Sequence, residues 1–158
     1  MKTPYRNVLS ISFLFMAVLL SCKPDAPRPE ATPGFEKTFI DTHDGYSEAV
    51  AFVSGGLKTI YVSGQVGEGP DLDSQMRSAL SNLKEVLGKA GATMDDVVKM
   101  NTYIVDYGPQ SLETFRGVRR ELLGDTEMPA STLVGVESLA LPEWLIEIEA
   151  IAVMPVTE

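Results

Sequence analysis

Hydrophobic and polar residues alternate along several stretches of this chain. From Ile146 to Val153, Ile, Ala and Val alternate with two glutamates, and successive side chains of a strand point to opposite faces. Glu147 and Glu149 therefore share one face of a terminal strand, which we expect to meet water, a ligand or another subunit rather than a core. Similar patterns predict strands at residues 35–41, 46–54, 58–63, 97–106, 130–137 and 144–154.

Two other stretches follow the helical period. Over residues 72–90, Leu, Met, Ala and Val recur every three or four positions, and Asp71 or Asp73 can cap the start of this helix. A second helix is predicted from Ser111 to Leu123. Each helix has one apolar stripe, so both are expected on one face of a mixed β-sheet, as an α+β two-layer domain. The other face of the sheet has no cover left in the chain, which predicts an oligomer.

The first 34 residues have a different character from the rest. Lys2 and Arg6 precede 13 largely apolar residues (8–20), a run that is short for a membrane span of roughly 20 residues and suits a signal peptide. The run ends at Ser21 and Cys22, the only cysteine, and this junction resembles a bacterial lipobox. We therefore expect residues 1–21 to be a signal peptide and Cys22 to be lipidated. An ordinary signal peptide or an uncleaved anchor are the alternatives.

Residues 22–34 contain four prolines, which favour an extended linker between the lipid and the domain. The remaining residues, 35–158, have the length of one domain. The expected product is an exported bacterial lipoprotein that is anchored to a membrane and faces the periplasm or the cell surface.

Charge and composition exclude several classes of function. The chain has 22 acidic and 13 basic residues, and without Lys2 and Arg6 its net charge is −11, so nucleic acid is not an expected partner. His43 is the only histidine and no cysteine follows Cys22, so no metal site is expected. The chain has neither a P-loop nor a Gly-x-Ser-x-Gly motif, and no cofactor is expected.

Four stretches of the domain, at residues 46–50, 61–65, 82–99 and 146–153, form a recognisable pattern in their order and spacing. In this pattern the domain resembles the RidA family, also called the YjgF or reactive-intermediate deaminase family. The resemblance covers nearly all of residues 38–154. It implies a chorismate-mutase-like α+β subunit, a homotrimer, and clefts between subunits that bind small metabolites.

The resemblance also assigns roles to individual residues. Tyr46 matches a tyrosine of the pocket, and Ser63 and Gly64 match the Ser-Gly pair that ends a strand at the cleft. Glu147 matches the carboxylate that orients the attacking water when the family's deaminases hydrolyse an imine or enamine. Ser63-Gly64 and Glu147 are accordingly expected to be opposite walls of one cleft between subunits.

One position departs from the deaminase pattern. The family's Pro-Ala-Arg-Ser becomes Pro129-Ala130-Ser131-Thr132 here, so Ser131 replaces the arginine that clamps the substrate carboxylate. A lost charged hydrogen bond of this kind costs about 2–5 kcal/mol. Arg116, on the second predicted helix, could replace the guanidinium if it reaches the cleft, and a solvated surface arginine is the alternative.

Three functions remain open from the sequence. The domain could bind a small metabolite or perform divergent hydrolytic chemistry, as the loss of the arginine favours. It could be a 2-iminobutanoate/2-iminopropanoate-type deaminase in which Glu147 orients water. It could also be a trimeric scaffold on the membrane.

Overall fold

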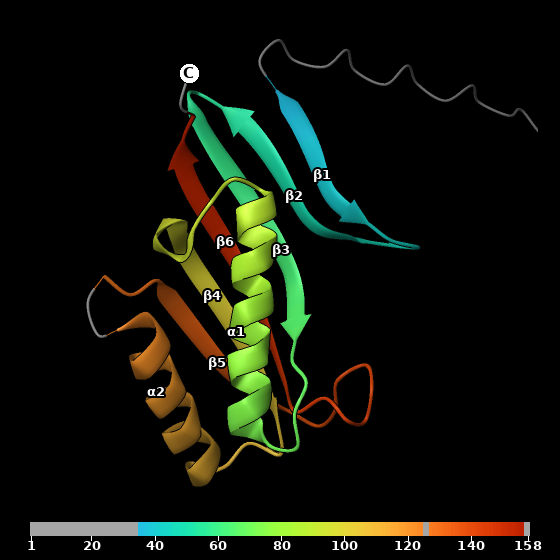
Figure 1. Cartoon of the computed structure of the whole chain (residues 1–158), viewed down its shortest axis with the longest axis vertical. Helices are drawn as coiled ribbons and strands as arrows, with labels where there is room; N and C mark the ends of the chain where they lie inside the picture. Colours follow the sequence, from blue (N-terminus) through green and yellow to red (C-terminus); the bar gives the residue numbers. More distant parts are fainter. Residues whose placement is uncertain (1–34, 125–126, 157–158) are drawn as a thin grey trace, which may run out of the picture. The chain divides into compact units, whose positions relative to one another are not determined.

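The computed structural model describes residues 35–124 and 127–156. Within these ranges the chain forms six strands, two α-helices and one short 3₁₀ helix (Figure 1). In chain order the elements are β1 (Glu36–Thr42), β2 (Ser47–Ser54), β3 (Leu57–Val66), α1 (Leu72–Lys89), η1 (Met94–Asp96), β4 (Val97–Val105), α2 (Pro109–Leu123), β5 (Ala130–Val136) and β6 (Ile146–Pro155).

The strands form one mixed sheet with the order β1-β2-β3-β6-β4-β5. All neighbouring strands are antiparallel except β4 and β5, which run parallel and are connected through α2. A parallel pair needs such a crossover connection, whereas antiparallel strands can be joined by a tight turn. α1 packs across β3 and β6, and α2 lies beside it on the same face (Figure 1). The predicted α+β two-layer architecture is confirmed.

The core lies between this helical layer and one face of the sheet. Along β6, burial alternates: Ile146, Ile148, Ala150 and Ala152 are buried, while the residues between them are partly exposed. α1 contributes its apolar stripe to the same layer, with Met76, Ala79, Leu80, Leu83, Val86 and Leu87. Glu147 and Glu149 therefore lie together on the sheet face opposite the helices, as their spacing predicted. No helix in the described ranges is long and apolar enough to cross a membrane.

Several boundaries differ from the sequence prediction, each for a local reason. β3 continues to Val66 because a bulge at Ser63 and Gly64 lets the strand resume pairing with β6. α2 begins at Pro109 rather than at Ser111, since the fixed φ of proline suits the first position of a helix. β6 begins two residues later than predicted because Trp144 still belongs to the preceding turn, where its backbone N–H donates to the carbonyl of Leu141.

The sheet face opposite the helices is not covered by any described element, and it has two unlike halves. Over β1 to β3 it is aromatic, with Phe39, Phe52 and Tyr61; Phe39 is 61% exposed, and the rings of Phe52 and Tyr61 stack with centroids 6.0 Å apart. Over β6 and β4 it is polar, with Asn101, Tyr103, Glu147 and Glu149. We call these the aromatic half and the polar half. An apolar patch of this kind is typical of an interaction surface.

Candidate functional site

The candidate site is built where β3 meets β6. The register between these antiparallel strands shifts between Val62 and Gln65, which leaves Ser63 and Gly64 as a bulge. A Cβ atom on Gly64 would overlap the carboxyl group of Glu147. The side chain of Glu147 therefore lies directly over the Gly64 backbone, and only glycine leaves room for it. Ser63-Gly64 and Glu147 form one wall within a single chain, so their expected placement on opposite walls was wrong.

The two glutamates of β6 have different surroundings. Glu149 Oε1 accepts a hydrogen bond of 2.6 Å from Asn101 Nδ2 and one of 3.2 Å from the Tyr103 hydroxyl. The half-buried carboxyl of Glu147 receives no hydrogen bond from residues 35–124 or 127–156. Partial burial, followed by the nearby charge of Glu149, raises the pKa of Glu147 above its ordinary value. Loss of solvation disfavours the charged form, and the missing donors leave it uncompensated.

This difference separates the chemistry available to the two carboxyl groups. Glu149 is held by its donors and contributes a fixed negative charge beside the site. Glu147 is free to exchange a proton with a bound water or ligand, and a raised pKa makes a carboxylate a better base at neutral pH. Burial and the charge of Glu149 also raise the pKa of Tyr103, which remains a protonated phenol on the same polar half.

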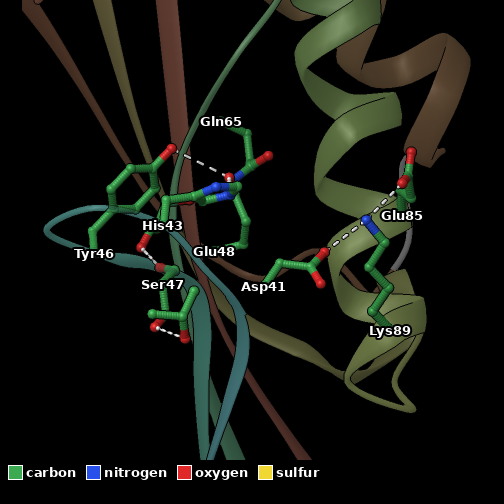
Figure 2. Close-up of polar contacts among 10 residues, drawn as sticks. Asp41, His43, Tyr46, Ser47, Glu48, Gln65, Glu85 and Lys89 are labelled. Carbon is green, nitrogen blue, oxygen red and sulfur yellow. Dashed lines mark hydrogen bonds and ion pairs between the residues drawn. The ribbon is translucent and has the colours of Figure 1, made fainter.

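Ser63, which belongs to this wall, and Tyr46, immediately before β2, both have structural partners. The Ser63 hydroxyl donates a 2.7 Å hydrogen bond to the carbonyl of Ser47, so its proton is engaged with β2. The Tyr46 hydroxyl donates to Glu48 at 3.3 Å, and its ring lies beside that of His43 (Figure 2). His43, at the turn before β2, is partly exposed and contacts Glu48 at 3.0 Å. Nothing in the sequence pattern indicates that His43 and Tyr46 both contact Glu48.

Ser131 lies elsewhere in the subunit. It is on the edge strand β5 and pairs with the buried Met100, so it faces the helices, whereas Glu147 faces the opposite side of the sheet. β4 separates β5 from β6, and neighbouring strands are about 4.8 Å apart. One chain therefore does not bring Ser131 to Glu147.

An arginine does reach Ser131, but it is Arg119 and not Arg116. Arg119 Nη1 donates a 3.2 Å hydrogen bond to Ser131 Oγ, and its guanidinium lies 5.7 Å from the centre of the Phe115 ring. Arg116 is exposed and has no contact with Ser131. The start of α2 at Pro109 and the packing of Phe115 decide which arginine turns toward β5. The helical spacing of Phe115 and Arg119 was the available signal, since residues four apart share a helix face.

Other features of the described residues do not coincide with this wall. A cavity of about 720 Å³ lies on the helical side, between α1 and α2, with Leu80, Met94, Met100, Leu123 and Met128 among its lining residues. Neither Gly64 nor Glu147 lines it.

Among the described residues, no group of three or more His, Cys, Asp or Glu side chains could hold a metal ion. Cys22, the expected lipidation site, lies outside the described residues.

Gly64→Ala tests whether the contact with Glu147 defines the site. We expect a loss of about 1–3 kcal/mol in unfolding free energy, because the new methyl group displaces the Glu147 carboxyl. The same change in a Glu147→Ala background should cost less, since the obstructing group is gone. Chemical denaturation of the four proteins measures this coupling.

Gly88→Ala is the matched control for this experiment. A Cβ atom on Gly88 meets nothing within 4 Å, and the residue lies in the last turn of α1. Alanine there should be neutral or should stabilise by up to about 1 kcal/mol. Equal costs of Gly64→Ala with and without Glu147 would contradict the contact.

Comparisons with known proteins agree with this architecture. Residues 37–154 match the family model described as Endoribonuclease L-PSP. The RutC family protein YjgH of Escherichia coli K12 is 35% identical over 122 residues, which cover 72% of this chain and 89% of that protein. The 2-iminobutanoate/2-iminopropanoate deaminase of Dermatophagoides farinae is 33% identical over 118 residues, which cover 69% of this chain and 85% of that protein.

A solved structure extends the similarity to three dimensions. Rv2704 of Mycobacterium tuberculosis, described as a member of the YjgF/YER057c/UK114 family, superposes with a TM-score of 0.64 at 33% identity. The alignment covers 74% of this chain and 98% of Rv2704. The family model, the sequence relatives and the fold all lead to the same assignment: this chain belongs to the RidA/YjgF family.

Proposed function

We propose that the Gly64–Glu147 wall is one side of a small-molecule site in which Glu147 activates water. The observation that carries this proposal is the half-buried Glu147 carboxyl, which lies against a glycine bulge without a hydrogen-bond donor and has a raised pKa. In the hydrolytic form of the proposal, a water oxygen attacks the electrophilic carbon of a bound metabolite while Glu147 accepts the water's proton. Glu147 then returns the proton to the leaving group as its bond to that carbon breaks.

A second chain is needed to complete this site. The aromatic half of the open sheet face is exposed in one subunit, and the resemblance to the RidA family implies a homotrimer. Association through this face would remove Phe39 and Tyr61 from water, which is favourable for apolar surface. It would also enclose Glu147 and bring residues of a neighbouring chain to the polar half.

Imine or enamine deamination is the second candidate, and one contact favours it. Ser131 stands at the position of the family's substrate-clamping arginine, but Arg119 donates a hydrogen bond to Ser131 and thus puts a guanidinium beside that position. A planar guanidinium can bind a carboxylate through two hydrogen bonds. A relative that is 33% identical is named a 2-iminobutanoate/2-iminopropanoate deaminase. In this reaction water adds to the C=N carbon, and the C–N bond breaks to give a carbonyl compound and ammonia.

Ribonucleic acid is a poor candidate for the substrate, although the family model is described as an endoribonuclease. The chain carries a net charge of −9, and the polar half presents two glutamates to any ligand. Phosphate backbones are bound by clusters of Lys and Arg, whose neutralising charge supplies most of the affinity. A small metabolite fits the charge of the site better.

The place of the protein in the cell is also a proposal. Lys2, Arg6, the apolar run at residues 8–20 and the single Cys22 support an exported lipoprotein held to a membrane by a lipid on Cys22. Residues 22–34 would then be the linker between the lipid and the domain.

Imine hydrolysis tests the proposed chemistry. With 2-iminopropanoate generated in situ, residues 35–158 should accelerate the release of ammonia, and Glu147→Gln should reduce the rate about 100-fold or more because the general base is lost. Glu137→Gln, a change of the same type at an exposed position after β5, is the control. If wild type gives no acceleration, this substrate class is excluded. Activity that survives Glu147→Gln contradicts the role of Glu147.

Substitutions of Arg119 and Arg116 in the same assay test whether a guanidinium binds the substrate carboxylate, as imine deamination would require. Arg119→Ala should reduce kcat/KM about 30-fold or more if its guanidinium binds the substrate carboxylate. Arg116→Ala, on the same helix but without contact to Ser131, should have little effect. Equal effects of both substitutions would show that Arg119 is only one of several surface charges.

Self-association is tested by placing a charge on the aromatic half. We expect a trimer in analytical ultracentrifugation, and Phe39→Glu should dissociate it because burying a carboxylate in an apolar interface is unfavourable. Leu122→Glu is the control, since Leu122 is 46% exposed on α2 on the helical side of the sheet. A monomeric wild type, or a trimer unaffected by Phe39→Glu, would contradict association through this face.

Cys22→Ser tests the proposed anchor. In a bacterial host, the full-length wild-type protein should fractionate with membranes, and the variant should be released because a serine cannot carry the thioether-linked lipid. Immunoblotting of the membrane and soluble fractions measures the change. Membrane association that persists in the variant would point to an uncleaved anchor.

A further inference from the structure

A carboxylate with no assigned role is linked to the Ser63–Gly64 bulge through one side chain, Gln65. Glu48 on β2 is half-buried and contacts three side chains (Figure 2). Its Oε1 accepts from His43 Nε2 at 3.0 Å and from the Tyr46 hydroxyl at 3.3 Å, and its Oε2 accepts from Gln65 Nε2 at 2.9 Å. Both of its oxygens are therefore engaged by partners from the turn before β2 and from β3.

Gln65 connects this carboxylate to the bulge. Its side-chain nitrogen donates to Glu48 and also to the carbonyl of Ser63 at 3.1 Å. Gln65 is only 6% exposed, and a buried amide that loses its partners pays a desolvation cost. The Ser63 hydroxyl in turn donates a 2.7 Å hydrogen bond to the carbonyl of Ser47. Ser63 is thus held at two atoms, and the next residue is Gly64, on which Glu147 lies.

We propose that Glu48 is a positioning residue that holds Tyr46 and, through Gln65, the Ser63–Gly64 bulge in one arrangement. This inference rests on the proposed function, because its consequence for chemistry depends on Glu147 being the base. Tyr46 and Glu147 share no contact in the described structure, yet a continuous series of contacts joins them through Glu48, Gln65 and the bulge.

No lysine or arginine of the described residues forms an ion pair with Glu48. A cavity of about 250 Å³ beside the cluster is also lined by Asp41 of β1 and by Asn82, Glu85 and Lys89 of α1. Lys89 is engaged with Asp41 and Glu85, both at 2.8 Å, and so does not pair with Glu48 (Figure 2). The Asn82 side-chain amide donates to the carbonyl of Val66. Among the described residues, His43 is therefore the basic side chain that contacts Glu48.

Glu48 also determines the state of Tyr46. Its negative charge is the main cause that raises the pKa of the Tyr46 hydroxyl, with burial and the hydrogen bond as smaller causes. The phenol consequently remains a hydrogen-bond donor directed at Glu48. Without this acceptor, the half-exposed ring of Tyr46 can rotate away, and the Gln65 amide can turn from the Ser63 carbonyl.

Glu48→Ala tests the proposal by nuclear magnetic resonance of residues 35–158 labelled with ¹⁵N and with ¹³C-tyrosine. The Gly64 amide and the Tyr46 ring signals should both move, and by more than any shift in Glu36→Ala. Glu36 is the matched control because it is an exposed glutamate on β1 without a side-chain partner. Glu48→Gln keeps one acceptor oxygen and should give smaller shifts in the same direction.

The outcomes distinguish this inference from the proposed function. Shifts at Gly64 and Tyr46 in Glu48→Ala support positioning even if the domain hydrolyses no imine. If imine hydrolysis is observed, kcat should fall about tenfold or more in Glu48→Ala, since displaced catalytic groups lose rate steeply. Unchanged Gly64 and Tyr46 signals overturn the inference whatever the activity. Should Glu48→Ala fail to fold, Glu48→Gln is read by the same signals, and unchanged Gly64 and Tyr46 signals in that variant overturn the inference.

Discussion

The close approach of the Glu147 carboxyl to the Gly64 backbone is the constraint on which the rest of the site depends. It requires a glycine at one position of β3, and a bulge that moves this glycine out of the regular ladder. It also requires that β6 keep its alternation, so that Ile146 and Ile148 enter the core while Glu147 lies between them on the other face. Core packing on one side of the sheet thereby fixes where a carboxyl of raised pKa stands on the other side.

The two faces of the sheet carry different kinds of residue. The helical face holds most of the apolar core, and the other face has an aromatic half suited to association and a polar half that contains both glutamates. Ser131 and Arg119 are on the helical side of an edge strand, away from Glu147 of the same chain. One chain therefore does not bring Ser131 or Arg119 to Glu147, and a site that used all three would need a neighbouring chain.

Regular periodicity was the part of the sequence that predicted structure well. α1 and the alternation of β6 follow directly from repeating apolar positions, because each element has to bury one side. The identity of the arginine beside Ser131 could not be read in this way. It depends on the length of the loop before α2 and on the docking of Phe115. The four-residue spacing of Phe115 and Arg119 indicates that they share a helix face, but only the docked helix shows that this face meets Ser131. The convergence of His43, Tyr46 and Gln65 on Glu48 also involves residues up to 22 positions apart in the chain.

The sequence by itself determined the α+β class, the family, the shared face of Glu147 and Glu149, and the replacement of an arginine by Ser131, because these follow from local periodicity and from residue identity. The tertiary structure alone decided that Ser63-Gly64 and Glu147 form a single wall, that Arg119 reaches Ser131, and that Glu48 joins Tyr46 to the bulge. Each of these results depends on strand register or on helix docking, and both are set by the packing of the whole core rather than by neighbouring residues.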